Sequence, residues 1–203
     1  MVTLYYSPQS RAIRPRWMLE EIGAPYQLER LNLQAGDQKR PAYLKINPNG
    51  TVPAIVDGDL VLFESAAICQ YLADKHPEAR LAPSLGSPDR ARYYQWIHFA
   101  MSGLEPPAVN VFLHTMGKPE ADRLPAVVEE SRRQLAAALR VTEAAVAGRS
   151  FIVGDRLTTA DVMIGSTLAW AQMMGLIGAD LPATTAYLTG LGARPAFQRT
   201  MAD

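Results

Sequence analysis

The chain has 203 residues, with 20 lysine or arginine residues and 20 aspartate or glutamate residues, so its formal net charge at pH 7 is zero. This balance, without any basic run, argues against a protein that binds nucleic acid or adsorbs electrostatically to a membrane. The length suffices for one large or two small domains, and no apolar run approaches the roughly 18 residues of a membrane-spanning helix.

The few cysteine and histidine residues limit the chemistry further. Cys69 is the only cysteine, so the chain cannot form an internal disulfide. The histidines, His76, His98 and His114, stand far apart, and no CxxC or HxxxH spacing occurs, so we expect no metal site. The first residues lack the apolar segment that is typical of a signal peptide. We therefore expect a cytoplasmic protein in a reducing compartment.

The first 76 residues have the pattern of a small α/β domain. Residues 2–6 are β-branched or aromatic and stop at Ser7-Pro8, which is typical of a strand. Helical spacing follows and ends at Gly23, and Asp57-Gly58 favours a tight hairpin turn. In chain order, we predict a strand over residues 2–6, a helix over 12–22, a strand over 26–33, a short helix over 41–44, a hairpin over 54–56 and 60–63, and a helix over 65–75.

Everything beyond residue 88 has helical spacing. Residues 76–88 contain three prolines and lack apolar periodicity, so a linker is expected there. Thr158 and Asp161 form a capping-box pattern before residues 162–174, which are so apolar that we expect them to form the central helix of this part. Further helices are predicted over residues 89–116, with a kink or break at Pro106-Pro107, over a segment from 128 to 146, and over residues 182–191 and 195–201.

One stretch, from Asn47 to Val56, suggests a peptide-binding edge. Asn-Pro and Asn-Gly mark a turn, and Pro53 stands at the head of an apolar strand. A cis bond before Pro53 would leave the backbone N–H and C=O groups of Val52 facing a cleft, where an extended peptide could pair. Ser65, at the start of a predicted helix, could offer its hydroxyl and free N–H groups to a carboxylate. A buried turn and an ordinary helix cap fit these residues equally well.

The order of these elements resembles that of the cytosolic glutathione transferases over essentially the whole chain. The resemblance depends on Val52-Pro53 before the third strand, on Glu64-Ser65 at the next helix and on the Thr158-x-x-Asp161 box. It implies an α/β plus all-α protein, with a thioredoxin-like βαβ-α-ββα domain over residues 1–76, a linker over 77–88 and an all-helical domain over 89–203. It also implies a homodimeric detoxifying transferase that uses glutathione as co-substrate and a small hydrophobic electrophile as second substrate.

The resemblance also implies a set of glutathione contacts. In that family the residue before the proline pairs through its backbone with the cysteinyl part of glutathione, and a Glu/Gln-Ser pair holds the γ-glutamyl end. Polar groups of a loop of variable length hold the glycine carboxylate. Gly50 stands where delta-like enzymes have a histidine, so one such contact is expected to be missing. The matching positions in this chain are Val52, Pro53, Glu64, Ser65, Gln38 and Lys39.

A transferase must also activate the glutathione thiol. Its pKa is about 8.5, and lowering it by about two requires roughly 2.7 kcal/mol of selective stabilisation of the thiolate, to which a hydroxyl donor can contribute. Arg11-Ala12 resembles an element of the theta- and delta-like classes whose catalytic serine corresponds to Ser7. Ser10, beside the expected helix start, and Tyr5, which aligns with the catalytic tyrosine of other classes, are the alternatives.

Some features match the beta class instead. Pro8 and Pro15 fit its pattern, but Arg11 stands where its cysteine would be, which disfavours mixed-disulfide chemistry. We expect Cys69 to be buried core. Arg11 and Arg14 either stabilise negative charge in the site or are solvated surface charges.

The electrophile pocket is expected on the first long helix of the helical domain, at Tyr93, Trp96, Met101 and Phe112. Aromatic residues at helical spacing are more often core, so a structural role remains open for each of them. Two rival functions also remain open. One is a glutathione-dependent isomerase, peroxidase or dehalogenase on the same fold. The other is a non-catalytic relative that acts as an interaction or stress-response protein.

Overall fold

The computed structural model describes residues 1–202 and divides into two compact units. The N-terminal unit comprises Met1–Ala82 together with the segment that begins at Ala193, and the helical unit comprises Pro83–Gly192. The N-terminal unit therefore contains both ends of the described chain.

The N-terminal unit is built on a four-stranded mixed sheet in the order β2-β1-β3-β4. Strands β1 and β2 are parallel, whereas β3 is antiparallel to both β1 and β4. The central residues Leu4 and Ile55 pair across β1 and β3 and are fully buried. The strands are β1 (Val2–Tyr6), β2 (Tyr26–Arg30), β3 (Ala54–Asp57) and β4 (Leu60–Phe63). The predicted hairpin is confirmed.

Strand β2 ends three residues earlier than the sequence pattern predicted. The side-chain oxygen of Asn32 accepts hydrogen bonds from the backbone N–H groups of Gln34 and Ala35, both at 3.0 Å. Such a local bond turns the chain and competes with the strand ladder, so the strand stops at Arg30.

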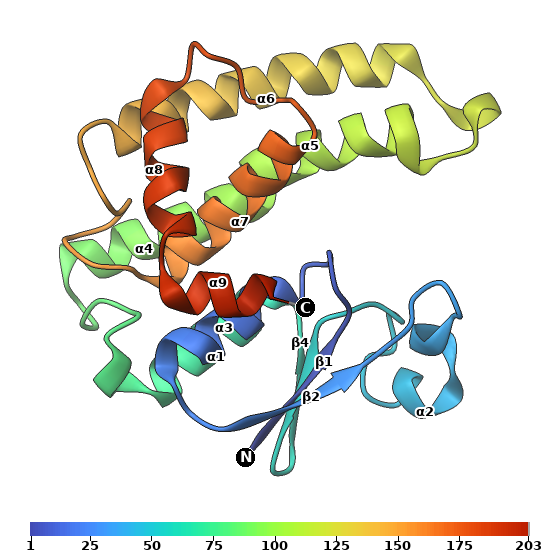
Figure 1. Cartoon of the computed structure of the whole chain (residues 1–203), viewed down its shortest axis with the longest axis vertical. Coiled ribbons are helices and arrows are strands. Elements are labelled where there is room, and N and C mark those ends of the chain that lie inside the picture. The colour runs from blue at the N-terminus through green and yellow to red at the C-terminus, as the bar shows by residue number, and fades with distance from the viewer. Residues whose placement is uncertain (203) are drawn as a thin grey trace. The chain divides into compact units, whose positions relative to one another are not determined.

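Helices α1 (Ile13–Ile22) and α3 (Ser65–Lys75) pack against one another on one side of the sheet, and the short helix α2 (Pro41–Leu44) lies on the other side (Figure 1). Helix α1 ends at Gly23, which adopts a left-handed conformation with φ of 73° and donates to the carbonyl of Leu19. The predicted ranges of α2 and α3 are confirmed. Two 3₁₀ turns, Asp37–Lys39 and Pro77–Ala79, complete the unit.

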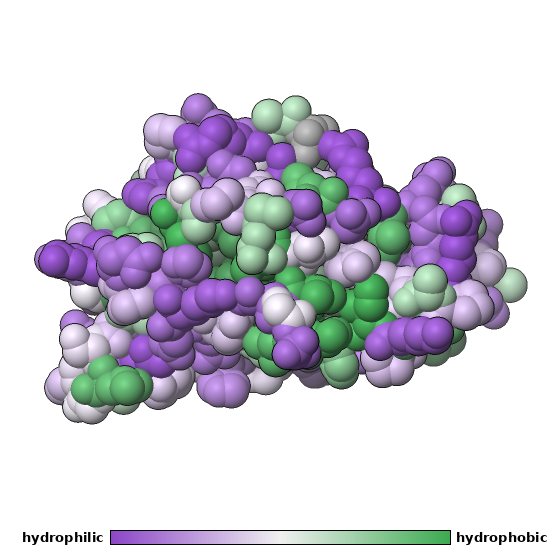
Figure 2. Space-filling model, turned by 90° about the horizontal axis from the view of Figure 1, so that it is seen from below, coloured by the Kyte–Doolittle hydropathy of each residue, from purple (hydrophilic) through white to green (hydrophobic). Residues whose placement is uncertain are grey.

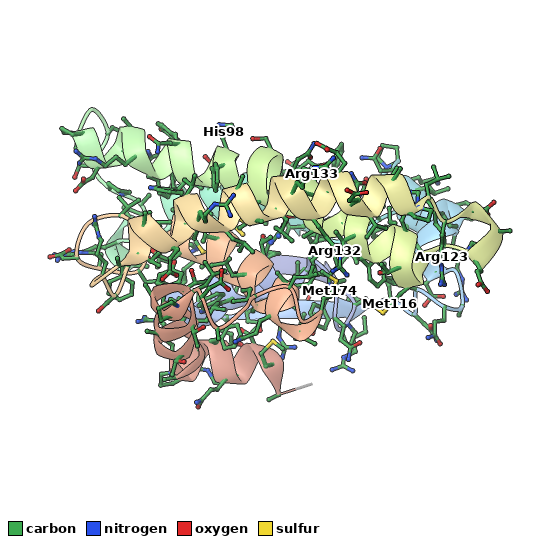
Figure 3. All side chains as sticks on the ribbon, turned by 90° about the horizontal axis from the view of Figure 1, so that it is seen from above. His98, Met116, Arg123, Arg132, Arg133 and Met174 are labelled. Carbon is green, nitrogen blue, oxygen red and sulfur yellow. The ribbon has the colours of Figure 1, made fainter. Side chains whose placement is uncertain are left out.

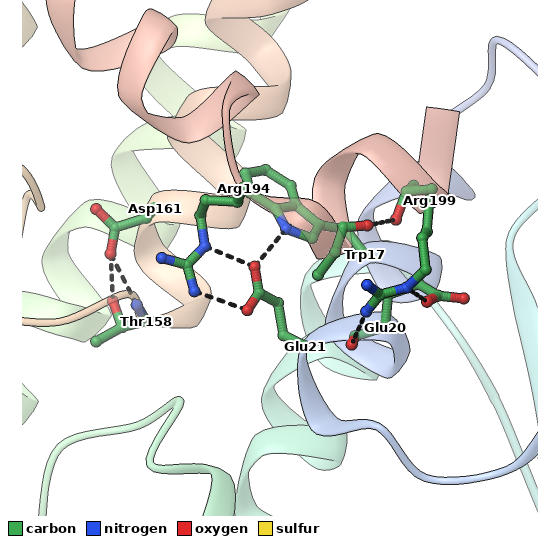
Figure 4. A network of polar contacts seen from close by, with 9 residues as sticks. Trp17, Glu20, Glu21, Thr158, Asp161, Arg194 and Arg199 are labelled. Atoms are coloured by element: carbon green, nitrogen blue, oxygen red, sulfur yellow. Dashed lines mark hydrogen bonds and ion pairs between the residues drawn. The ribbon is translucent and has the colours of Figure 1, made fainter. Parts of the chain in front are cut away.

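Helix α9 (Pro195–Met201) packs on α1 and belongs to the N-terminal unit, whereas the resemblance implied an all-helical domain over residues 89–203. The rings of Trp17 and Phe197 meet edge to face at 4.7 Å. Glu21 accepts a bidentate pair from Arg194, at 2.7 and 2.8 Å, and a third bond from the indole N–H of Trp17 at 3.0 Å (Figure 4). The sequence pattern predicts this helix but not its packing partner.

The helical unit contains five α-helices in its described residues: α4 (Pro88–Phe99), α5 (Glu105–Phe112), α6 (Pro125–Val146), α7 (Thr159–Met173) and α8 (Pro182–Gly192). Residues 88–117 are helical without interruption, which agrees with the predicted helix over residues 89–116, but π-helical turns at Ala100–Leu104 and Leu113–Gly117 flank α5. Pro106 and Pro107 follow the first of these turns directly, and since proline has no backbone N–H, they cannot continue the helical hydrogen-bond ladder there.

Helix α7 lies at the centre of the helical unit, as predicted, because eleven of its 15 residues are buried. Its predicted capping box between Thr158 and Asp161 is confirmed. Asp161 also accepts hydrogen bonds from the backbone N–H of Ile152 at 2.7 Å and from the hydroxyl of Tyr187 at 2.8 Å. One carboxylate thus joins the start of α7 to the preceding loop and to α8.

Candidate functional site

The register of three adjacent strands brings the candidate glutathione-binding segments to one end of the sheet. Tyr5 of β1 pairs with Ala54 of β3, and Ala54 pairs with Phe63 of β4. Ser7 follows Tyr5 by two residues, Val52 precedes Ala54 by two, and Ser65 follows Phe63 by two. Because β3 runs antiparallel to both neighbours, the end of β1, the start of β3 and the end of β4 coincide. Residues far apart in the sequence therefore meet at this sheet end.

The two candidate serines differ in how their hydroxyl groups are used. The Ser10 hydroxyl donates to the carbonyl of Ser7 at 2.6 Å and accepts from the N–H of Ala12 at 3.2 Å, so it shapes the turn before α1. The Ser7 side chain is buried, and no hydrogen bond of the described residues involves its hydroxyl. Because the Ser7 oxygen is not among the fully buried side-chain atoms without a partner, its hydroxyl is available for a ligand.

The third candidate, Tyr5, packs against the neighbouring loop. Its ring lies 5.5 Å from the ring of Tyr43, and burial together with the charge of Glu29 raises the pKa of Tyr5. A raised pKa keeps the phenol neutral and makes it a weaker donor to an anion.

The Val52–Pro53 peptide bond is cis, as the sequence pattern suggested. The preceding carbonyl, that of Thr51, accepts hydrogen bonds from the hydroxyl of Tyr43 at 2.6 Å and from the side-chain amide of Asn47 at 2.7 Å. Within the described residues, neither the N–H nor the C=O of Val52 makes a hydrogen bond. A half-buried residue with both backbone groups unpaired offers an edge to which an extended peptide can add.

The start of α3 lies beside this edge. Glu64 is exposed and has φ of 73°, a region that only the surrounding structure can impose on a residue with a side chain. Ser65 is the first helical residue and is buried. The N–H of Ile68 donates to the carbonyl of Glu64, whereas the preceding N–H groups of the first turn lack helical acceptors, an arrangement that favours an anion.

Arg14 is a buried cation behind the same helix start. Its guanidinium donates to the Ser65 hydroxyl at 3.1 Å, and only 4% of the residue is exposed. Because Ser65 accepts this bond, its own proton is free to donate to a ligand. Arg11, by contrast, is exposed. The sequence contained a signal that separates the two arginines, since Arg14 shares a helical face with the buried residues Trp17 and Met18.

The loop that carries Gln38 and Lys39 is tied to the turn before Val52. The Lys39 amine donates to the carbonyl of Asn49 at 3.2 Å. A Cβ atom at Gly50 would lie 2.8 Å from the same amine, so Lys39 occupies the space of any side chain at position 50. Gln38 donates to the carbonyl of Leu33 at 3.3 Å, while its buried side-chain oxygen has no partner among the described residues. Both side chains thus present polar groups at this loop.

The candidate electrophile residues all belong to the helical unit. Tyr93 and Trp96 are buried in its core, which matches the structural role left open for them, whereas Met101 and Phe112 are half-buried. The ring of Phe112 lies 5.7 Å from that of Trp170, a partly exposed residue of α7 that the sequence patterns did not single out.

The two histidines without an assigned role differ in their surroundings. His98 is exposed, whereas His114 is buried and accepts a hydrogen bond from the N–H of Leu124 at 2.9 Å. Its other ring nitrogen lies 3.0 Å from the amine of Lys118, so His114 links the two ends of a loop.

Cys69 is fully buried on α3, and this burial raises the pKa of its thiol, although the nearby Arg14 acts in the opposite direction. Among residues 1–202, no three His, Cys, Asp or Glu side chains gather in a way that could hold a metal ion. None of the helices in that range combines the length and apolar content needed to cross a membrane.

Comparison with known proteins identifies the family. Residues 1–74 match the family model of the glutathione S-transferase N-terminal domain, and residues 104–195 match that of the C-terminal domain. Glutathione S-transferase 3 of Zea mays is 35% identical over 98% of this chain and 92% of its own length. Glutathione S-transferase F9 of Arabidopsis thaliana is 32% identical over 100% of this chain and 97% of its own length.

Solved structures agree with this match. A glutathione transferase family member from Pseudomonas fluorescens pf-5, crystallised with two glutathione molecules bound, is 31% identical, covers 98% of this chain and 92% of its own, and has a TM-score of 0.87. The glutathione transferase URE2P6 of Phanerochaete chrysosporium, in complex with oxidized glutathione, is 29% identical. It covers 99% of this chain and 94% of its own, with a TM-score of 0.86. Sequence and fold thus agree over nearly the whole chain, which belongs to the glutathione S-transferase family.

Proposed function

We propose that this protein binds glutathione at the sheet end of its N-terminal unit, stabilises the thiolate through the Ser7 hydroxyl and adds that thiolate to a small hydrophobic electrophile. The observation that carries the proposal is the unpaired Ser7 hydroxyl at the same sheet end as the unpaired backbone of Val52. A thiol donor with a peptide backbone, such as glutathione, satisfies both groups at once. The reaction is then addition or aromatic substitution by the thiolate.

The charges around the site favour a γ-glutamyl tripeptide. The exposed Glu64 carboxylate attracts the α-ammonium group, while the Ser65 hydroxyl and the free N–H groups of α3 donate hydrogen bonds to the α-carboxylate. The backbone of Val52, before Pro53, pairs with the cysteinyl residue. Gln38 and Lys39 then provide donors for the glycine carboxylate, and Lys39 fills the space left by Gly50, which compensates for the missing histidine.

Ser7 contributes to catalysis as a hydrogen-bond donor to the sulfur. A hydrogen bond to a charged group is worth about 1.5–3 kcal/mol, which corresponds to a decrease of roughly one to two in the thiol pKa. Because the pKa of the free thiol is about 8.5, this decrease makes the thiolate a substantial fraction of the bound glutathione near neutral pH. Ser10 is a weaker candidate because its hydroxyl already has two partners. This assignment corresponds to a theta- or delta-like serine enzyme that retains some beta-class features.

For the electrophile, we assign the partly exposed apolar residues of the helical unit rather than its core. Met101 and Phe112 remain candidates, and Trp170 joins them because its ring packs against Phe112. Tyr93 and Trp96 are buried too deeply to contact a substrate directly.

The proposed enzyme is a cytoplasmic homodimer. Strand β4 is an edge strand of the sheet, and its residues Leu60 and Val61 are 38% and 44% exposed. On the face that Figure 2 shows, hydrophobic residues gather in patches between hydrophilic ones. Unprotected apolar edge strands usually have a partner, and a second copy of this chain is the simplest one.

The decisive experiment is an ultraviolet titration of the thiolate of bound glutathione in the wild type and in Ser7→Ala and Ser10→Ala. We expect Ser7→Ala to return the thiol pKa toward about 8.5 and to lower kcat/KM for an aromatic halide roughly 10- to 100-fold. Ser10→Ala, as the matched control, should lose stability but keep a low thiol pKa. Unchanged pKa and rate in Ser7→Ala would refute the assignment of Ser7. Failure of the wild type to bind glutathione would refute the function itself.

A further inference from the structure

The carbonyl oxygen of Thr51 is held by two buried side chains. It accepts hydrogen bonds from the hydroxyl of Tyr43 at 2.6 Å and from the side-chain amide of Asn47 at 2.7 Å. A carbonyl oxygen has two lone pairs, so both acceptor positions of this one are filled. Tyr43 and Asn47 are only 4% and 1% exposed, so water competes poorly for either bond. We call these two residues the Thr51 clamp.

The clamp also orients the next backbone N–H group, because the Thr51 carbonyl shares a rigid peptide unit with the N–H of Val52. The bond between Thr51 and Val52 is trans. In a planar trans unit the C=O and N–H groups point in opposite directions. Holding the carbonyl on Tyr43 and Asn47 therefore turns the Val52 N–H away from them. This N–H makes no hydrogen bond within the described part of the chain.

The two donors of the clamp are themselves fixed. The ring of Tyr43, on α2, lies 5.5 Å from that of Tyr5 on β1. The side-chain oxygen of Asn47 accepts from the N–H of Asn49 at 3.1 Å, and the N–H of Asn47 donates to the carbonyl of Tyr43 at 2.9 Å. Burial raises the pKa of Tyr43 to about 12, so its hydroxyl keeps its proton and remains a donor. The direction of the Val52 N–H is thus set before a ligand binds.

Two donors on one carbonyl also polarise the peptide unit, which strengthens the N–H at its other end as a donor. In the proposed complex, the Val52 N–H donates to the cysteinyl part of glutathione in the manner of an added strand. Orientation before binding lowers the entropic cost of forming that bond. Both effects pass through the Thr51–Val52 peptide, since the Tyr43 hydroxyl is occupied and the residue is buried.

We propose that Tyr43 is a positioning residue for glutathione, which acts through the Thr51 carbonyl to direct the Val52 N–H toward the ligand. The inference rests on the proposed function, because it concerns the same sheet end. It separates two tasks within this site. The clamp contributes to the affinity for glutathione, whereas Ser7 controls the thiolate fraction of the bound ligand.

The test compares Tyr43→Phe, which removes the hydroxyl and keeps the ring, with a matched control. Tyr71→Phe also removes a phenolic hydrogen bond, at 2.7 Å, but its acceptor is Asp57 at the opposite end of β3. A second control lies in the helical unit, where Figure 3 shows Arg133 on α6. Arg133→Gln breaks exposed ion pairs there and leaves the N-terminal unit unchanged.

Each variant is measured with and without glutathione. Urea denaturation gives the stability, calorimetric titration gives the affinity for glutathione, and ultraviolet titration gives the pKa of the bound thiol. In the ligand-free protein, the amide nitrogen resonance of Val52 reports on the hydrogen bonds of the Thr51 carbonyl, because the two groups belong to one peptide unit.

In Tyr43→Phe the affinity for glutathione should fall about 5- to 10-fold, a partial loss because Asn47 still donates to Thr51. The bound thiol should keep its wild-type pKa, so that KM for glutathione rises while kcat is retained. The Val52 amide nitrogen resonance should shift. Tyr71→Phe should lose comparable stability but match the wild type in affinity and resonance, and Arg133→Gln should match it in every measurement.

Unchanged affinity in Tyr43→Phe, or an equal loss in Tyr71→Phe, would overturn the proposal. A bound thiol in Tyr43→Phe with a pKa as high as in Ser7→Ala would also overturn it, because Tyr43 would then act on the sulfur. Failure of the wild type to bind glutathione would refute the proposed function instead. In that case the ligand-free protein still decides on the clamp, since an unshifted Val52 resonance in Tyr43→Phe would show that the hydroxyl does not orient this peptide.

Discussion

Arg14 shows how a single buried charge can affect ligand selectivity. Its guanidinium donates to the Ser65 hydroxyl, so this hydroxyl keeps its proton for a ligand carboxylate. The positive end of α3 and the cation of Arg14 lie together, an arrangement that an anion stabilises. In the proposed complex, this anion is the α-carboxylate of the γ-glutamyl residue.

We therefore expect Arg14→Gln to weaken binding of glutathione by about 10-fold, and to weaken binding of an analogue that lacks the α-carboxylate much less. Calorimetric titration of both ligands measures the difference. Arg11→Gln, which removes an exposed charge from the residues before α1, is the matched control and should preserve the preference for glutathione. Equal losses for both ligands in Arg14→Gln would mean that Arg14 only supports the packing of α1 on α3.

At the scale of elements, the attachment of α9 to α1 depends on one carboxylate. Glu21 accepts three hydrogen bonds, from Arg194 and Trp17, and its side chain is mostly buried. Removing the Glu21 carboxylate takes an ion pair away from a partly buried guanidinium, which is costly.

Glu21→Gln should therefore lower the free energy of unfolding by about 1–3 kcal/mol, as measured by urea denaturation. The control is Asp155→Asn, which breaks an ion pair with Arg156 between two exposed side chains and should change the stability by less than about 1 kcal/mol. Similar losses in both variants would show that α9 is not held by Glu21.

A second link joins the end of β3 to α3. Asp57 accepts hydrogen bonds from Lys75 and from the hydroxyl of Tyr71, and these bonds, the one from Lys75 above all, lower the pKa of Asp57. Since the folded-state pKa lies below the unfolded one, the contribution of Asp57 is complete above the unfolded pKa of about 4 and disappears as the pH falls through the folded value.

Asp57→Asn should thus lower stability at pH 7 by about 1 kcal/mol, a modest figure because Lys75 is exposed to solvent. The variant and the wild type should converge as the pH falls through the lowered folded-state pKa of Asp57. Denaturant titrations between pH 2.5 and 7, all at about the same ionic strength, measure this convergence. A constant difference over the whole pH range would contradict the role of the Asp57 charge.

At the scale of the whole molecule, local signals were sufficient for the sequence to predict most elements. The ranges of β1, α3 and α9 were predicted to the residue because turn residues or prolines mark their ends. The π-helical turns around α5 were not predicted, since α- and π-helical turns share the same apolar spacing at this length.

Long-range packing explains most of the remaining differences between the sequence predictions and the structure. No sequence pattern shows that α9 packs on α1, because an amphipathic helix can bury its apolar face against either unit. The burial of Arg14 was not predicted although Arg14 shares a helical face with Trp17 and Met18, since a charged residue on an apolar stripe is usually assigned to the surface. The residues of the glutathione site were easier to predict from the sequence, because Val52-Pro53 and Glu64-Ser65 are local motifs. The register of the sheet alone brings these motifs together.

The edge of this sheet leads to a prediction about assembly. Val61 lies on β4, whose outer edge has no strand partner within the described residues, and is 44% exposed. If a second copy covers this edge, a charge placed there must be desolvated or must separate the two copies. Val61→Glu should therefore weaken dimerisation by at least about 10-fold, as measured by sedimentation equilibrium. Leu85→Glu, at an even more exposed apolar residue of the helical unit, is the control and should sediment like the wild type. A monomeric wild type would refute the proposed dimer, and an unchanged dimer in Val61→Glu would place the interface on another surface.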